Sequence, residues 1–144
     1  MAKVEIIQSL AKEIQKKFKG ESHKIISLLR DLEKNPKKGK LLGSVGGIVI
    51  KELKYKSFRF YFITDGYKLK LLDEESLTGL LIKFVRMSDK KDQQKTINEI
   101  KDVLRKVGKQ GFVWLSNIPL LLYLLEKNLS GLRKGNKSLK AKDI

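Results

Sequence analysis

The stretch KELKYKSFRFYF, residues 51 to 62, places four cationic side chains among aromatic residues. They are Lys51, Lys54, Lys56 and Arg59, in a segment whose alternation is typical of a β-hairpin. Lysine and arginine bind phosphate groups, and a neighbouring tyrosine can stack on an unpaired nucleic acid base. A plain sheet needs no such charge, so the segment predicts contact with a polyanion.

Cleavage of RNA by this chain would have to rely on those cations. Attack by the adjacent 2′-hydroxyl needs a base for its proton, cations against the charge developing on phosphate, and a donor for the leaving oxygen. The single histidine, His23, falls among helix residues and is expected to lie on the surface or pack. No His, Asp and Glu residues have the spacing of a metal site. We therefore predict neither a metal nor another cofactor.

The composition favours nucleic acid as the partner. Subtracting 16 acidic from 32 basic residues gives a net charge of +16 in 144 residues, a length that fits one domain. A lysine-rich surface that serves only solubility is the alternative. No cysteine is present, which excludes disulfides. The N-terminus lacks a signal-peptide pattern and the longest uncharged run, 110–125, is too short to span a membrane, so a soluble cytoplasmic protein is expected.

The periodicity of the chain predicts an α+β fold. A short strand is expected at 4–7, followed by a helical hairpin over 10–32 that ends at Pro36. The Gly-rich segment 39–47 is expected to be a loop, and it lacks the arrangement that wraps phosphates. A four-stranded antiparallel meander then follows. Its predicted strands are 48–54, 58–64, 67–72 and 80–86.

Alternation along these strands predicts two different faces. The apolar face is expected to pack against the helices, and the other face is expected to be basic and open to RNA. A merely solvated face carrying lysine and tyrosine is the alternative. The apolar face comprises Phe58, Phe60, Phe62, Leu69 and Leu71, and the basic face comprises Arg59, Tyr61, Lys68, Lys70 and Lys83.

The last part of the chain is expected to be helical. A third helix carries Ile97, Ile100, Leu104 and Val107 on one stripe and ends at Gly108. Residues 109–144 are expected to form a helical extension packed on the same domain, followed by a basic tail.

The order of elements and three local motifs over residues 4 to 108 resemble the RelE/ParE superfamily of toxins from type II toxin-antitoxin modules, particularly its HigB-like branch. LEKNP at 32–36 is similar to the family's L-x-x-N-P at the end of the helical hairpin. ELK at 52–54 and FRFYF at 58–62 resemble E-L-R and the following Y-R. FVRMSDKKDQQ at 84–94 resembles F-x-K-K-T/S and a helix that begins with lysines.

The resemblance implies a RelE-like toxin domain over 1–108 that acts as a ribosome-dependent, metal-free mRNA endoribonuclease, or mRNA interferase, and is restrained by an acidic antitoxin. Lys54, Arg59 and Arg86 fall on the cationic positions of its motifs and are the expected catalytic residues. The partners implied are RNA, the ribosome and the antitoxin. The expected RNA-binding residues are Lys51, Lys56, Tyr61, Lys68, Lys70, Lys83 and Lys90.

Two other functions remain open at this stage. Lys54, Phe58 and Met87 stand where the family has Arg, Tyr and Lys. A non-catalytic RNA- or ribosome-binding protein on the same scaffold tolerates these differences. A toxin that acts on gyrase through protein contacts, as ParE does, is the other alternative.

Overall fold

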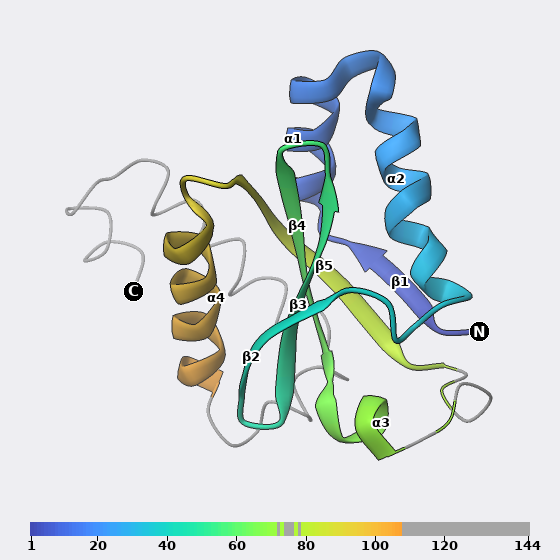
Figure 1. Ribbon diagram of the computed structural model, residues 1–144, viewed down its shortest axis with the longest axis vertical. Coiled ribbons are helices and arrows are strands. Elements are labelled where there is room, and N and C mark those ends of the chain that lie inside the picture. The colour runs from blue at the N-terminus through green and yellow to red at the C-terminus, as the bar shows by residue number, and fades with distance from the viewer. Residues whose placement is uncertain (72, 74–76, 78, 108–144) are drawn as a thin grey trace.

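The computed structural model describes residues 1–71, 73, 77 and 79–107, and confirms the predicted α+β fold (Figure 1). A helical hairpin at the N-terminus packs on a mixed sheet of five strands. The helices are α1 (Gln8–Phe18), α2 (Ser22–Arg30), α3 (Gly66–Leu71) and α4 (Gln93–Val107). The strands are β1 (Lys3–Ile6), β2 (Lys40–Val45), β3 (Ile48–Tyr55), β4 (Phe58–Asp65) and β5 (Leu81–Asp89).

The strand order in the sheet is β1-β5-β4-β3-β2. Four strands, β2 to β5, are antiparallel to their neighbours, and β1 pairs in parallel with β5. The predicted number of antiparallel strands and the additional N-terminal strand are therefore confirmed. Two segments differ from the prediction: β2 is a strand that was not predicted, and the predicted strand 67–72 is not one of the four.

The Gly-rich segment 39–47 forms β2, so its prediction as a loop is wrong. Gly46 and Gly47 have positive φ angles of 58° and 85° and make the tight turn that pairs Val45 with Ile48. The glycines belong to the turn of a hairpin rather than to an extended loop. Pairing with β3 supplies the backbone hydrogen bonds that make the preceding residues a strand.

The segment predicted as the strand 67–72 is a helix, α3, over its described residues. The Asp65 carboxylate accepts hydrogen bonds from the backbone N–H groups of Tyr67 and Lys68 at 3.0 and 3.1 Å. These are donors that the first turn of a helix leaves unsatisfied, so Asp65 caps α3. The Asp-Gly pair that indicates a turn is here the start of a helix.

The helical hairpin covers the phenylalanine face of the sheet, as predicted. The Phe18 ring of α1 lies 5.1 Å from that of Phe58 and 6.2 Å from that of Phe60, and the Phe62 and Phe84 rings lie 4.8 Å apart. Leu69, expected to join this face from the sheet, packs on the core from α3 instead. The side chain of Leu71 and the predicted fourth helix and tail lie outside the described residues.

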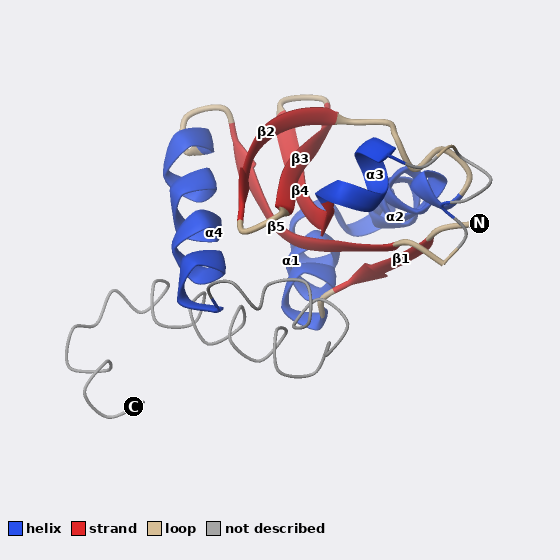
Figure 2. Ribbon diagram, turned by 90° about the horizontal axis from the view of Figure 1, so that it is seen from below, coloured by secondary structure: helices blue, strands red, loops and turns tan. Residues whose placement is uncertain are grey.

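The opposite face of the sheet is covered by α4, which contacts β2 and β5 (Figure 2). Of the predicted stripe, Ile97, Ile100 and Leu104 are buried, together with Val103, and the side chain of Val107 lies outside the described residues. Since α4 packs on this face, Glu52, Arg59 and Tyr61, which alternate toward it, are buried, whereas Lys54 near the end of β3 is exposed. In the described part of the chain, no helix has both the length and the apolar character needed to cross a membrane.

Candidate nucleic-acid interface

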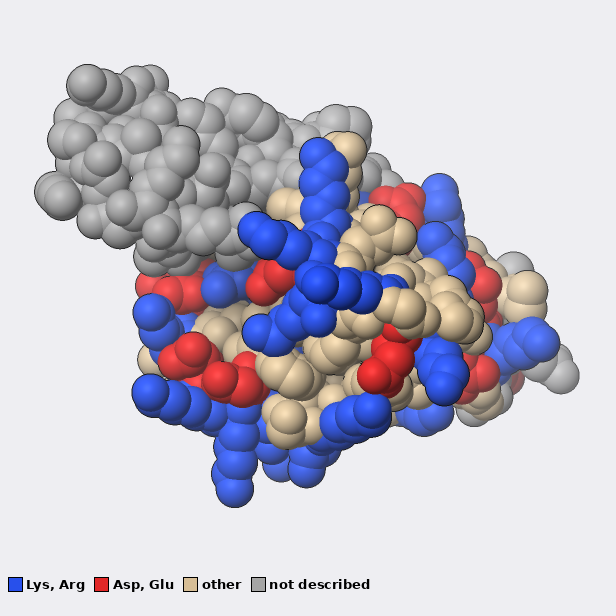
Figure 3. Space-filling view, turned by 90° about the horizontal axis from the view of Figure 1, so that it is seen from above, with Lys and Arg blue, Asp and Glu red and all other residues tan. Residues whose placement is uncertain are grey.

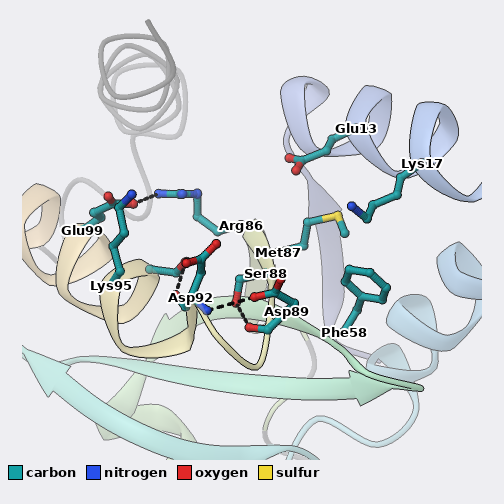
Figure 4. Close-up of a pocket in the computed structure, with 11 residues that line it drawn as sticks. Glu13, Lys17, Phe58, Arg86, Met87, Ser88, Asp89, Asp92, Lys95 and Glu99 are labelled. Carbon is teal, nitrogen blue, oxygen red and sulfur yellow. Dashed lines mark hydrogen bonds and ion pairs between the residues drawn. The ribbon is translucent and has the colours of Figure 1, made fainter. Parts of the chain in front are cut away.

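A cleft of about 290 Å³ opens along the C-terminal half of β5 (Figure 4). Strand β1 pairs only with residues 81–84 of β5, although β5 continues to Asp89. The remaining edge of β5 therefore lies between α1 on one side and α4 on the other. The cleft is lined by Glu13, Lys17, Phe58, Arg86, Met87, Ser88, Asp89, Asp92, Lys95, Thr96 and Glu99.

A β-bulge at Val85 sets the direction of Arg86. Phe62 pairs with Phe84 and Tyr61 pairs with Arg86, so Val85 is an extra residue in β5. Phe84 and Arg86 are two residues apart and would share a face of a regular strand. The bulge instead leaves Phe84 on the face of the helical hairpin and turns Arg86 toward α4.

Arg86 forms an ion pair with Glu99 of α4 in this cleft. Its Nη1 donates to Glu99 Oε1 at 2.8 Å, and the two side chains are 17% and 13% exposed. Both groups are therefore accessible from the cleft without being fully solvated. Arg86, an expected catalytic residue, thus lies in a cleft, and its guanidinium group is paired with a carboxylate.

Arg59 is buried, so its predicted exposure on an open basic face is wrong. Its Nε lies 3.9 Å from Glu52 Oε1 and has no hydrogen-bond partner among the described residues, while Nη1 donates to the Ser57 carbonyl at 3.4 Å. Glu52 also accepts a hydrogen bond of 3.0 Å from Gln93 at the start of α4. The physical reason is that α4 packs over this part of the sheet.

Tyr61 and Lys83 are also buried, which contradicts their predicted availability to RNA. The Tyr61 hydroxyl and Ser88 Oγ share a hydrogen bond of 2.7 Å, and burial raises the pKa of Tyr61 despite that bond. Lys83 is fully buried and its Nζ donates to Glu5 of β1. Burial lowers the pKa of Lys83, although the hydrogen bond and charge of Glu5 act in the opposite direction.

Lys51 points to the other side of the sheet from Arg59. Its side chain is buried, and its Nζ donates to the carbonyl of Lys37 at 2.9 Å. It lies 5.9 Å from the centre of the Phe62 ring. Burial lowers the pKa of Lys51. This lysine, expected to bind RNA, is part of the interior in the described structure.

The strand register brings together the three expected catalytic residues. Lys54 lies directly opposite Arg59, which lies opposite Ser88 of β5, and Tyr61 lies opposite Arg86. The three cationic residues therefore share one face of the sheet, with Arg86 diagonal to Arg59 on the next strand. Lys54 is exposed at the rim of this group, whereas the two arginines are held by carboxylates.

Exposed lysines gather at the end of the molecule where the α1–α2 turn, the β3–β4 turn and the β5–α4 loop meet. Figure 3 looks onto this end, which we call the lysine end, and shows blue side chains around a hollow with carboxylates between them. Lys56 joins the first two segments through an ion pair of 2.9 Å with Glu21. Lys17 lies over the Phe58 ring at 4.9 Å. The exposed lysines of the lysine end are Lys16, Lys17, Lys19, Lys54, Lys56, Lys90, Lys91 and Lys95.

The remaining two lysines expected to bind RNA lie elsewhere. Lys68 and Lys70 are exposed on α3, which follows the opposite end of β4 from the β3–β4 turn (Figure 1). Because this segment is a helix, they do not extend the sheet face as predicted. The lysine end therefore contains Lys54, Lys56 and Lys90 of the expected residues, without the α3 pair.

Two carboxylates of the site, Glu52 and Glu99, were not identified from the sequence. The signal for Glu99 is its position beside Ile100 and one turn after Thr96 on the packed face of α4. For Glu52 it is the alternation that places this residue on the same face as Lys54. No group of three or more His, Asp or Glu side chains in the described ranges could hold a metal ion.

Comparison of the chain with known proteins found no matching family model, no matching curated protein and no matching solved structure.

Proposed function

We propose that the protein binds single-stranded RNA through the lysine end. The observation that supports this function is that eight exposed lysines from three separate chain segments gather at one end of the molecule, where two of them, Lys17 and Lys95, line the cleft. Clustered lysines bind the phosphate backbone and release its counterions, which gives affinity that falls steeply with salt. RNA, rather than another polyanion, is chosen because of the resemblance to RelE-like toxins.

Four of these lysines are the best candidates for phosphate contacts. Of the eight, all but Lys56 form no ion pair with a described residue, and Lys54, Lys90, Lys91 and Lys95 are those from β3, the β5–α4 loop and the start of α4. Their charge is therefore available to a ligand. Lys56, by contrast, already shares the carboxylate of Glu21.

The test compares two variants with the same change in net charge. One replaces Lys54, Lys90, Lys91 and Lys95 with Gln, and the control replaces the exposed Lys34, Lys37, Lys68 and Lys70 with Gln. Binding of a labelled single-stranded RNA is measured by fluorescence anisotropy over a series of salt concentrations.

The lysine-end variant is expected to lose affinity, and its salt slope is expected to fall by about 0.7 for each contact removed. The control should keep most of the affinity. Equal losses in the two variants would show that net charge alone attracts RNA and would overturn the assignment of the surface.

A second candidate function is metal-free cleavage of translated mRNA, as in RelE-like toxins restrained by an acidic antitoxin. The observation that favours it is the register that gathers Lys54, Arg59 and Arg86 on one sheet face. The Arg86 guanidinium could stabilise the charge that develops on phosphate, and Lys54, exposed at the rim of this group, is the candidate for transfer of the 2′-hydroxyl proton. An antitoxin that fits the lysine end would carry carboxylates on an amphipathic helix.

The variant for this test should avoid the buried pair. Removing Arg59 leaves the charge of buried Glu52 without its cationic partner, so loss of activity could reflect unfolding. Lys54→Met with Arg86→Gln keeps that pair. Growth and mRNA integrity are followed after controlled expression in bacteria, with circular dichroism as a check on folding.

Growth arrest with message cleavage, both lost in the folded double variant, would establish the ribonuclease. Normal growth with intact message would leave RNA binding as the function. Arrest without message cleavage would instead favour a protein target such as gyrase.

A further inference from the structure

We propose that Arg86 is the centre of a phosphate-binding site in the cleft, and that Glu99 occupies this site in the free protein. The inference rests on the proposed RNA-binding function and adds a specific phosphate contact to it. Lys17 and Lys95 reach into the same cleft from α1 and α4 and would contact the same ligand (Figure 4).

The contact between Arg86 and Glu99 has the chemistry of an anion site. A carboxylate and a phosphate both accept hydrogen bonds from the planar fork of a guanidinium group. Within the described part of the chain, the Arg86 guanidinium donates only to Glu99, at 2.8 Å from Nη1. The bulge at Val85 directs the arginine to this position, so the placement of its side chain is built into the strand.

The site is open, which distinguishes it from the second arginine pair. Arg86 and Glu99 are 17% and 13% exposed and line a cleft of about 290 Å³. Arg59 and Glu52 are only 8% and 7% exposed and do not line it. A phosphate could therefore reach Arg86 through the cleft if the Glu99 side chain rotated away, with no rearrangement of the sheet.

The charge balance of the cleft shows why Glu99 would control entry. Its lining contains three cations, Lys17, Arg86 and Lys95, and four carboxylates, which gives −1. Asp89 and Asp92 are exposed carboxylates at this opening and oppose an incoming anion. When the Glu99 carboxylate is neutralised or leaves, the count becomes zero, and the surrounding lysine end then makes the opening net attractive.

Glu99→Gln tests this inference, because it removes the charge and keeps the shape of the side chain. Asp102→Asn is the matched control. It lies three residues further along α4, removes one negative charge, and breaks the exposed pair of Arg105 and Asp102 at 3.0 Å. Binding of a short labelled RNA is measured for both variants, for Arg86→Gln and for the Arg86→Gln, Glu99→Gln double variant.

Glu99→Gln is expected to bind RNA about fivefold more tightly than the native chain, whereas the general charge effect in Asp102→Asn should stay under about twofold. The gain should disappear when Arg86 is also replaced, because the two residues act through one contact. In the NMR spectrum, the Arg86 side-chain Nε–H signal should shift at lower RNA concentration in Glu99→Gln.

If Glu99→Gln and Asp102→Asn bind RNA with the same affinity, the inference fails while RNA binding by the lysine end stands. If the Arg86→Gln, Glu99→Gln double variant binds RNA more tightly than Arg86→Gln, the assignment of Arg86 to a phosphate site is also wrong. If neither the native chain nor Glu99→Gln binds RNA, the proposed function fails and this inference fails with it.

Discussion

Replacing Glu5 with Gln is expected to destabilise the fold in a way that depends on pH. Lys83 is fully buried and its ammonium group bonds to the Glu5 carboxylate, which is 26% exposed. Burial raises the pKa of Glu5, but the hydrogen bonds and charges of Lys83 and Lys3 outweigh it, so the pKa is lowered from 4.5. Without this carboxylate, the charge that acts on the buried ammonium from the described residues is that of Lys3, which repels it.

The stability lost in Glu5→Gln has an upper limit, because the protein can fold with Lys83 in its neutral form. Losing one partner of a buried ion pair costs about 3–5 kcal/mol. Deprotonating a lysine with an unfolded-state pKa of about 10.4 costs about 4.6 kcal/mol at pH 7 and about 1.2 kcal/mol at pH 9.5, at about 1.36 kcal/mol per pH unit. We expect Glu5→Gln to lower the free energy of unfolding by about 3 kcal/mol at pH 7, the lower end of that range, because Glu5 is partly exposed. At pH 9.5 we expect a loss of about 1 kcal/mol.

The sign follows from proton binding. In the variant the pKa of Lys83 is lowered further in the folded state, so the unfolded state binds more protons between the folded and unfolded pKa values. The free energy of unfolding of the variant therefore rises with pH through this window. The destabilisation relative to the native chain shrinks accordingly.

The assay is urea unfolding of the native chain and Glu5→Gln at both pH values. Asp102→Asn, which breaks an exposed pair, serves as control and should change the free energy of unfolding by at most about 0.5 kcal/mol. Lys83→Met should cost less than about 1.5 kcal/mol, because it removes the buried charge and Glu5 can reach solvent. A cost for Glu5→Gln that is equal at the two pH values, or no larger than that of the control, would refute the reasoning.

Three further substitutions test other parts of the fold. Gly39→Ala should destabilise by about 1–3 kcal/mol in urea unfolding, because Gly39 has φ +107° and a Cβ would lie 2.9 Å from the Phe62 ring. Tyr61→Phe removes the hydroxyl bonded to Ser88 at 2.7 Å, so it should cost about 1 kcal/mol and leave RNA affinity unchanged in the anisotropy assay. Lys51→Met should leave the free energy of unfolding at pH 7 unchanged or raise it. Because burial lowers the pKa of Lys51, the stability of the native chain should rise as pH approaches 10.5, and a pH series should show a smaller rise in the variant.

The elements that were predicted correctly are those whose pattern is local. The apolar spacing of the helical hairpin and of α4, and the alternation of β3, β4 and β5, are present in each segment by itself. Strand β2 depends on pairing with β3, which its Gly-rich composition does not reveal. Helix α3 depends on a carboxylate, Asp65, that stands outside the helix it caps.

Only part of the site could be predicted, again because only part of it depends on local sequence. Alternation correctly separated Arg59 and Tyr61 from the phenylalanines of β4, because that separation is a property of one strand. Exposure depends instead on what covers a face, and α4 reaches this face only in the folded chain. The direction of Arg86 depends on the extra residue Val85 in β5, and nothing in one sequence shows which residue will be left unpaired.

These differences separate the cations into two groups with different roles. The lysines of the lysine end are solvated point charges, so RNA bound by them alone would be held weakly, with little sequence preference and strong dependence on salt. Arg86 could orient a phosphate from the cleft, but it already pairs with Glu99, and Arg59 is buried beside Glu52. Cleavage would require at least Arg86 to exchange Glu99 for the substrate, whereas binding by the exposed lysines alone would not. The effect of Glu99→Gln on both affinity and message cleavage therefore distinguishes the two candidate functions: a change in affinity alone indicates an RNA-binding protein, and a parallel change in cleavage indicates that Arg86 acts on the reacting phosphate.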